Sequence, residues 1–266
     1  MQTALGKDTV IKATVLPANA TNKKLSWSSS DKNIAKVDKN GKIIVLNPGI
    51  ATITATAANG AKAECEVKVL IDSVLLDQRD ANIYEIVKIG EQYWMAENLR
   101  YLPQVDSAEN SLIQPKYYVY NYTGTEIGAA KTTANYETYG ALYNWLAALT
   151  ACPAGWHLPT SAEWDILVES VGNEAATKLK ATSVWPSGDK TDEFGFGALP
   201  GGRFDNGKFV TLLNNGHWWT STTQNSSQAD IKSMAWNHDY LSTVPSEKHK
   251  AYSLRCIAGE VDFTDF

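Results

Sequence analysis

The chain has 266 residues, a formal net charge of −5 and 44% hydrophobic residues. This length is enough for one large domain or two ordinary ones. No run of about 18 apolar residues occurs, so we expect no membrane-spanning helix. The three cysteines are too few for a disulfide scaffold, and none has CxxC or CxxH spacing, which argues against a structural zinc site.

Charge is distributed unevenly along the chain. Residues 1–70 contain ten lysines and five acidic residues, a balance of +5, whereas the remainder contains 14 basic and 24 acidic residues, a balance of −10. Of the nine tryptophans only Trp27 lies in the first part. These differences predict two domains. The acidic second part would repel phosphates, so we do not expect a nucleic-acid partner.

Short runs that alternate apolar and polar residues fill residues 1–70. Turn signals separate the runs, and the dipeptides Asn40-Gly41 and Asn59-Gly60 are typical of hairpins because both residue types tolerate positive φ. Short strands at this spacing, without a helical stretch, predict an all-β sandwich.

Two side chains of this first part are assigned to its core. Trp27 is expected to be the core aromatic. Cys65 shares the register of Val67 and Val69, which predicts a buried small side chain, and a reactive thiol is the alternative.

The next segment begins the second part of the chain. Residues 71–80 are expected to connect the two parts, and their lack of Gly and Ser favours a stiff joint. Alternation interrupted at Gly90 predicts a hairpin with strands over 82–89 and 92–96. Residues 102–134 have no clear period and predict a long loop with one short strand. Their tyrosines either form a binding surface or cover a core edge: Tyr117, Tyr118, Tyr120 and Tyr122.

Two helices are predicted from apolar spacing. The first has Tyr139, Leu142, Leu146 and Leu149 on one face. The second starts at a capping box formed by Thr160 and Glu163 and ends at Gly172. Its buried stripe is Trp164, Leu167, Val168 and Val171. A further short helix is expected within NEAATKLKATS, and loops and strands follow it.

Structural roles account for the charged groups near the second helix. Glu163 completes the capping box, and Asp165 lies in the first turn, where the helix dipole favours an acid. His157 is expected to be a framework residue, with a chemical role as the alternative. The glycines between residues 195 and 202 do not form a nucleotide-binding loop, because no strand–GxGxxG–helix order is present.

The first part resembles a known domain type. A W-x-S-S element, a V-D-x-x-G hairpin and a G-x-A-x-I-T-A strand follow one another, as in the bacterial immunoglobulin-like group 2 domain. The matching residues are Trp27, Ser29, Val37, Asp38, Gly41, Gly49, Ala51, Ile53, Thr54 and Ala55. The resemblance implies a spacer or adhesive module of an exported surface protein.

The second part resembles the Fibrobacter succinogenes major paralogous domain over Asp77 to Gly259. Seven motifs occur in that family's order: VKIGEQYWMAENLRY, YGALYNWLAAL, CPAGWHLPTSAEWDIL, KLKA, GFGALPGGRF, WWTST and YSLRCIAG. The family is similar to the C-type-lectin-like and formylglycine-generating-enzyme-like fold. We therefore expect an all-β sandwich over 1–70, an α+β C-type-lectin-like domain over 77–260 with two main helices and small antiparallel sheets, and a tail over 261–266.

The resemblance also implies a disulfide. In C-type-lectin-like domains a bridge commonly ties the helical region to the last strand, which here implies pairing of Cys152 with Cys256. Two buried thiols are the alternative.

The combination of domains implies a non-catalytic, exported surface protein of the adhesin type, with a glycan or protein ligand. Its location would be extracellular or on the outer cell surface, with Met1 marking a form from which an export signal was removed. In related lectin-like variable proteins, ligands meet the stretch that here runs from Thr220 to Tyr252, and the preceding loop contributes further candidates. The candidate binding residues are Arg203, Asn206, Asn225, Trp236, Asn237, His238 and Tyr240.

Three other functions are alternatives to adhesion. A self-associating structural subunit remains open. An oxygenase like the formylglycine-generating enzymes would need a close cysteine pair for copper, and only Cys256 is in the matching region. A hydrolase is disfavoured because the four histidines have no catalytic motif around them: His157, His217, His238 and His249.

No cofactor is expected, with calcium as the open alternative. Its candidate ligands lie in two oxygen-rich places: Asp189, Thr191, Asp192 and Glu193, and Asp230. Trp236-Asn237-His238 resembles the W-N-D calcium element of lectins, but a histidine replaces the hard oxygen ligand. The sequence specifies neither the ligand, nor the mode of anchoring, nor the oligomeric state.

Overall fold

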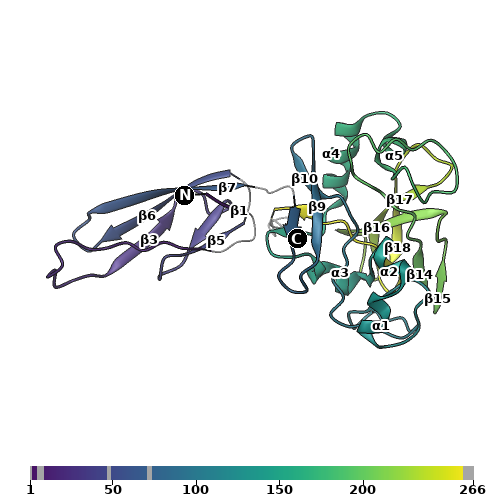
Figure 1. Cartoon of the computed structure of the whole chain (residues 1–266), viewed down its shortest axis with the longest axis horizontal. Coiled ribbons are helices and arrows are strands. Elements are labelled where there is room, and N and C mark those ends of the chain that lie inside the picture. Colours follow the sequence, from purple (N-terminus) through teal and green to yellow (C-terminus); the bar gives the residue numbers. More distant parts are fainter. Residues whose placement is uncertain (1, 5–8, 47–48, 71–73, 260–266) are drawn as a thin grey trace. The chain divides into compact units, whose positions relative to one another are not determined.

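A computed structural model describes residues 2–4, 9–46, 49–70 and 74–259 (Figure 1). The chain divides into two compact units, the first built mainly from residues 1–72 and the second mainly from 73–257. The predicted tail over 261–266 and the first residues of the predicted connector, 71–73, lie outside the described residues. None of the helices in the described ranges has the length and apolar character needed to cross a bilayer.

Where the structure describes it, the first unit consists of two sheets, which confirms the predicted all-β architecture. One sheet has the order β1 (Gln2–Ala4), β7 (Lys62–Leu70), β6 (Gly49–Ala57), β3 (Leu25–Ser29), and the other has the order β2 (Thr9–Val10), β5 (Lys42–Val45), β4 (Ala35–Val37). All pairs are antiparallel except β1 with β7.

The predicted turn at Asn40-Gly41 joins β4 to β5. The Asp38 carboxylate accepts the N–H groups of Asn40 and Lys42 at 2.8 and 2.9 Å. Gly41 has φ +78°, and a Cβ atom there would lie 2.5 Å from the Ile11 carbonyl oxygen. This turn therefore requires glycine.

Two assignments in the first unit need correction. Trp27 is only partly buried, because it lies on β3, an edge strand. Cys65 is also partly buried rather than enclosed, and it is a free thiol. Burial along β7 falls from Val67, which is fully buried, to Ala63, which is exposed, so Cys65 lies at the margin of the core.

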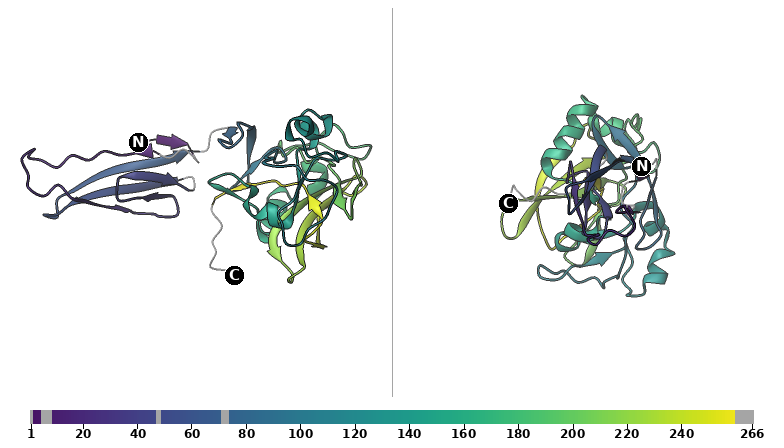
Figure 2. Two further views of the ribbon diagram at one scale, coloured as in Figure 1. Left: turned by 90° about the horizontal axis from the view of Figure 1, so that it is seen from below. Right: turned by 90° about the vertical axis from the view of Figure 1, so that its left-hand side faces the viewer.

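In its described residues the second unit contains three sheets and five short helices. The first sheet has the order β13 (Trp156–His157), β20 (Ile257–Ala258), β10 (Gln92–Met95), β9 (Ile83–Ile89), β8 (Val74–Leu76). The second has the order β11 (Tyr117–Tyr118), β12 (Leu142–Asn144), β19 (Ala251–Tyr252), β14 (Arg203–Asp205), β15 (Lys208–Val210). The third, drawn in green to yellow in Figure 2, has the order β16 (Asn215–Thr223), β17 (Gln228–Ala235), β18 (Ser242–Glu247). The helices are α1 (Ile127–Lys131), α2 (Ala134–Tyr139), α3 (Trp145–Ala151), α4 (Ser161–Val171) and α5 (Ala175–Leu179).

The first sheet of this unit contains the predicted hairpin. Strands β9 and β10 pair from Gln92 with Ile89 to Met95 with Ile86, and Gly90 turns the chain with φ +58°. Residues 74–76, which the sequence placed in the connector, form β8 and pair with β9.

The prediction of one continuous helix through residues 139–149 was wrong. Gly140 has φ +75° and ends α2, and β12 follows before α3 begins. A Cβ atom at position 140 would lie 2.7 Å from the Leu99 carbonyl oxygen, so the chain passes too close to Leu99 for any residue but glycine. Asn144 then caps α3 by accepting the Ala147 N–H at 3.0 Å.

The predicted long loop over 102–134 is more ordered than expected. It contains β11 and also helix α1, which was not predicted. Tyr118 is buried and stacks on Phe204 with ring centroids 4.2 Å apart, and Tyr120 packs on Phe209 at 5.2 Å. Of the two roles proposed for these tyrosines, covering the core is confirmed for this pair.

Helix α4 has the predicted capping box. The Thr160 hydroxyl accepts the Glu163 N–H, and the Glu163 carboxylate accepts the Thr160 N–H at 2.7 Å. Trp164 and Leu167 are fully buried and join the apolar core of the unit. Trp164 contacts Trp94 with ring centroids 4.8 Å apart.

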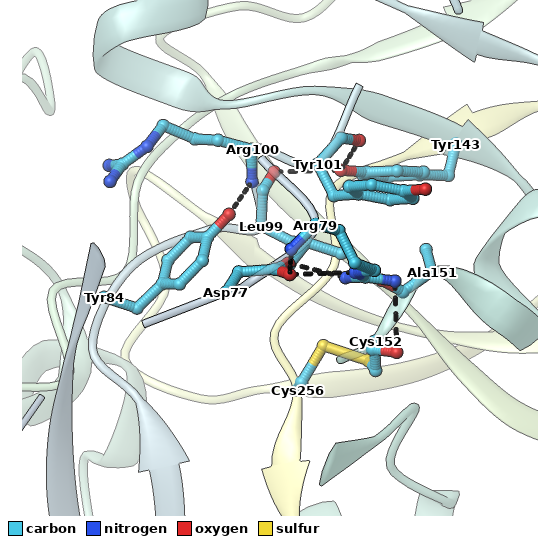
Figure 3. Close-up of a disulfide and its surroundings, with 10 residues drawn as sticks. All are labelled: Asp77, Arg79, Tyr84, Leu99, Arg100, Tyr101, Tyr143, Ala151, Cys152 and Cys256. Atoms are coloured by element: carbon cyan, nitrogen blue, oxygen red, sulfur yellow. Dashed lines mark hydrogen bonds and ion pairs between the residues drawn. A yellow bond between two sulfur atoms is a disulfide. The ribbon is translucent and has the colours of Figure 1, made fainter. Parts of the chain in front are cut away.

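The disulfide implied by the resemblance is present between Cys152 and Cys256, whose Cα atoms are 6.0 Å apart (Figure 3). Beside it, Arg79 forms an ion pair with the buried carboxylate of Asp77 at 2.6 Å and donates to the Ala151 carbonyl oxygen at 2.8 Å. The guanidinium also lies 3.7 Å from the ring centre of Tyr101. This arginine ties the turn after β8 to the C-terminal end of α3.

Candidate ligand-binding site

Strands β17 and β18 are joined by a short connection whose first five residues, Trp236 to Tyr240, are all exposed. We call residues 236–240 the tryptophan loop. Trp236 is 39% exposed and Tyr240 is 52% exposed. Leu213, in the segment that accepts a hydrogen bond from this loop, is 42% exposed. The loop therefore keeps two large aromatic side chains in contact with solvent.

The main chain of the tryptophan loop is bonded to elements on both sides of it. The Trp236 N–H donates to the Asn214 carbonyl oxygen at 2.9 Å, just before β16. The Asp239 carbonyl oxygen accepts the Ala176 N–H of α5 at 3.0 Å. The backbone of Gly188 also lies against the loop, because a Cβ atom there would be 2.5 Å from the Trp236 carbonyl oxygen.

A buried lysine lies beneath the loop. Lys180 follows α5, is 1% exposed, and its ammonium donates to the carbonyl oxygens of His238 at 2.6 Å and Trp236 at 3.5 Å. The ammonium lies 5.2 Å from the ring centre of Trp185. Burial lowers the pKa of Lys180 because it disfavours the charged form. The carbonyl oxygens thus replace part of the hydration that this ammonium loses.

The side chains of the loop offer both stacking and hydrogen bonding. His238 Nδ1 lies 2.5 Å from the Tyr240 hydroxyl, and the two rings meet edge to face with centroids 4.8 Å apart. Aromatic faces of Trp236 and Tyr240 suit apolar faces of a ligand, and the polar groups of residues 237–239 can donate or accept beside them. Such an arrangement is suited to binding.

The structure brings together four of the seven sequence-predicted residues. Trp236, Asn237, His238 and Tyr240 all belong to the tryptophan loop. Asn225 is in the turn between β16 and β17, separated from Trp236 by the length of β17, about 25 Å. Its Oδ1 atom accepts the N–H groups of residues 227 and 228, both at 2.9 Å, so this side chain shapes its own turn.

The other two predicted residues lie on the β14–β15 hairpin. Asn206 occupies its turn with φ +48° and accepts a hydrogen bond from Asn110 at 3.2 Å. Arg203 belongs to a polar cluster, where its Nε atom lies 3.5 Å from Asp205. Neither residue has a recorded contact with the tryptophan loop among the described residues.

The polar cluster around Arg203 includes a deeply buried histidine. Both ring nitrogens of His217 are buried, and neither has a hydrogen-bond partner among the described residues. Its ring meets that of Tyr252 edge to face, with centroids 5.5 Å apart. Burial, and secondarily the charge of Arg203, lower the pKa of His217 to about 3.

Two of the residues considered for calcium, Asp192 and Asp230, have protein partners. Asp192 accepts the Gly197 N–H at 2.8 Å, and burial raises the pKa of its carboxyl. Asp230 is buried and accepts from Ser161 and Gln224, each at 3.0 Å. Across the described ranges, no group of three or more His, Cys, Asp or Glu residues is placed to hold a metal ion.

Sequence reasoning missed the support of the loop. It did not single out Lys180, although the KLKA motif contains it, and it did not select Asp239 within the loop itself. Lys180 reaches residues 56 and 58 positions away in the chain, and no local pattern encodes such a contact. The presence of Lys180 in the KLKA motif was the one feature of the sequence that could have drawn attention to this residue.

Two known families match the chain. The Bacterial Ig-like domain (group 2) matches residues 3–67, and the Fibrobacter succinogenes major domain matches residues 87–258. The chain belongs to the Fibrobacter succinogenes major domain family. Both resemblances predicted from the sequence are thereby confirmed. The tryptophan loop and Lys180 lie within the part that matches the Fibrobacter succinogenes major domain.

Several curated proteins match over short stretches. An uncharacterized protein of Clostridium acetobutylicum is 46% identical over 70 residues, which is 25% of this chain and 7% of that protein. A second from the same organism is 36% identical over 100 residues, 37% of this chain and 25% of the relative. The kappa-carrageenase of Pseudoalteromonas carrageenovora is 46% identical over 59 residues, 22% of this chain and 15% of the enzyme. The chain therefore spans a quarter or less of these relatives.

Two solved bacterial structures are similar at a low level. An intimin mutant from EHEC O157:H7 gives a TM-score of 0.23 at 13% identity, covering 96% of this chain and 86% of that one. Invasin, a bacterial integrin-binding protein, gives 0.21 at 11% identity, covering 97% and 35%. Similarity at this level does not establish a shared fold.

Proposed function

We propose that this chain is part of an exported surface protein of the adhesin type, and that its second unit is a non-catalytic module that binds a glycan or protein. One observation carries the proposal. The tryptophan loop exposes all five side chains while hydrogen bonds to Asn214, Ala176 and Lys180 hold its main chain.

Such a loop is suited to recognition for two physical reasons. Exposed aromatic side chains provide a large contact area and stack on apolar faces of sugars or proteins. A main chain that is already ordered loses less conformational entropy when a ligand binds. Trp236 and Tyr240 therefore act as the anchors, and Asn237 and His238 provide hydrogen bonds that orient the ligand.

The disulfide supports a non-catalytic role over an oxygenase role. An oxygenase of the formylglycine-generating type would need two free thiols close together. Cys152 and Cys256 are bonded to each other, and the remaining cysteine, Cys65, lies in the first unit. The cysteines of the second unit are thus used to hold its fold.

The organisation that accompanies this function is a stalk with a binding module. Residues 1–70 are the immunoglobulin-like spacer and a C-type-lectin-like domain over 77–260 is the binding module, both displayed outside the cell. Of the expected connector 71–80, residues 74–76 belong to a strand of the second unit. The match of residues 3–67 to the Bacterial Ig-like domain (group 2) supports the spacer role.

A binding screen tests the proposal. The full chain is applied to a glycan array and a panel of host and bacterial surface proteins, with W236A and the double variant H238A/Y240A beside it. Any ligand found should bind the loop variants at least about tenfold more weakly, since a buried aromatic anchor commonly contributes more than 1 kcal/mol. The matched control is I166A, which removes an equally exposed apolar side chain on α4.

Unchanged binding by the loop variants would place the ligand elsewhere. Size-exclusion chromatography of the same samples distinguishes a ligand-binding module from a self-associating structural subunit. Concentration-dependent assembly without any foreign ligand is the result expected of a structural subunit, and it would replace the binding function.

A further inference from the structure

We infer that Lys180 and main-chain hydrogen bonds set the shape of the tryptophan loop, and that the side chains of residues 237, 238 and 240 do not. Lys180 is then a positioning residue, and residues 237, 238 and 240 are free to determine specificity. The statement about specificity rests on the proposed function, whereas the statement about shape is independent of it.

The position of Lys180 is itself fixed. Its N–H donates to the Ala176 carbonyl oxygen at 2.9 Å at the end of α5, and it forms a parallel bridge with Ala198. Ala176 and Ala198 are fully buried. The lysine side chain therefore starts from a rigid part of the core.

The ammonium of Lys180 is hydrogen-bonded to main-chain oxygens of the loop, and the negative charge of Asp239, a loop residue, also favours its charged form. No carboxylate among the described residues forms an ion pair with it, although it is nearly inaccessible to solvent. A buried cation that forms no direct ion pair is unfavourable unless polar groups replace its hydration. The groups that do so are the carbonyl oxygens of His238 and Trp236 and the ring of Trp185.

The other bonds that hold the loop also use main-chain atoms. They are the Trp236 N–H to Asn214, the His238 N–H to Ala235, and the Asp239 carbonyl oxygen with Ala176. Every residue type except proline supplies these atoms, so an exchange of side chains leaves the bonds intact. The side-chain bond recorded for the loop, between His238 and Tyr240, joins two loop residues and anchors neither to the core.

Amide NMR on the ¹⁵N-labelled full chain tests the inference without a ligand. In K180M, amide hydrogen exchange at Trp236 and at Ala176 should accelerate at least tenfold, and order parameters over 236–240 should fall below about 0.6. Exchange at Leu167, in the core of α4, should stay unchanged. K180R keeps a positive charge and hydrogen-bond donors at this position. It should therefore retain most of the protection of the Trp236 and Ala176 amides from exchange.

The control variant is K178M, two residues away on α5, where the lysine does not contact the loop. It should leave loop exchange at the wild-type rate. Unchanged loop exchange in K180M would overturn the inference.

A second variant keeps the inference testable if K180M does not fold. In N237A/H238A/Y240A the protection of the Trp236 and Ala176 amides should remain within twofold of wild type, and its loss would show that the side chains set the shape. The readouts also separate the two proposals. If no ligand is found but K180M loosens the loop amides as expected, only the proposed function is removed. If a ligand binds at the loop but the loop amides of K180M exchange at the wild-type rate, only the role of Lys180 is removed.

Discussion

One carboxylate oxygen of Glu163 lies 2.8 Å from Nε2 of His157, while the other accepts the N–H of Thr160 at 2.7 Å. The first contact reaches back to strand β13, and the second closes the capping box of α4. Burial opposes ionisation of Glu163, but the hydrogen bonds from His157 and Thr160 outweigh it and hold its pKa below the usual value. One acid therefore fixes both the start of the helix and the segment before it.

Replacing Glu163 should destabilise the protein. We expect E163A to lower the free energy of unfolding by about 1–2 kcal/mol, the usual effect of losing a cap and a charged hydrogen bond. Urea unfolding at pH 7 measures this change. E169A, which removes an exposed acid from the same helix, should change stability by less than about 0.5 kcal/mol. The lowered pKa of Glu163 stabilises the fold only at a pH where the carboxylate is ionised. The loss of unfolding free energy in E163A should therefore shrink as the pH falls below about 4. A loss that stays the same in acid argues against this role.

The buried His217 predicts acid sensitivity. Its pKa is about 3 in the folded chain, against about 6.5 in an unfolded one, so between these values the unfolded state takes up a proton that the folded state does not. Stability from this residue is therefore present above pH 6.5 and lost as the pH falls toward 3, by roughly 1 kcal/mol per pH unit. The groups that face the ring are Arg203, with Asp205 beside it, and Tyr252.

Urea unfolding of wild type and H217F from pH 7 to 4.5 tests this expectation. The variant should lose most of the slope, and the ring signals of His217 in wild type should not titrate in this range. An identical pH dependence in both proteins would assign the sensitivity to other groups.

The disulfide predicts a large loss of stability on reduction. It joins Cys152 to Cys256, which are 104 positions apart in the chain. Restriction of the unfolded chain by a loop of this length corresponds to about 4–5 kcal/mol in the chain-entropy model. Unfolding of the C152A/C256A double variant measures it, and intact mass should rise by two hydrogens on reduction of wild type. C65A is the control, and an equal loss of stability in C65A would contradict a specific role for the bridge.

The pair formed by Arg79 and Asp77 predicts that a lysine cannot replace the arginine. R79K keeps the charge but loses the forked donation to the carboxylate and the planar contact with Tyr101. We expect a loss of about 1–3 kcal/mol. K88A removes an exposed ion pair with Glu91 and should cost less than about 0.5 kcal/mol. Equal effects in thermal unfolding would mean that burial does not matter here.

Features with local causes were predictable from the sequence. The β9–β10 hairpin depends on alternation around Gly90, and the start of α4 depends on two residues three positions apart, Thr160 and Glu163. Each needs only neighbours in the chain. The disulfide followed from the family resemblance, because no local pattern in the chain pairs its two cysteines.

Features with distant causes were not predictable. The apolar spacing around residue 142 suits a helix, but the close approach of Leu99 imposes a positive φ at Gly140 and breaks it. Asn225 lies in the stretch expected to meet ligands, yet its side chain is bonded within its own turn. The burial of Lys180 depends on carbonyl groups that lie 56 and 58 positions further along the chain.

The first and last strands of the second unit, β8 and β20, belong to one sheet, in which β9 and β10 lie between them. The second unit therefore has both of its end strands anchored in the same sheet, and the sheet that carries β17 and β18 contains neither of them.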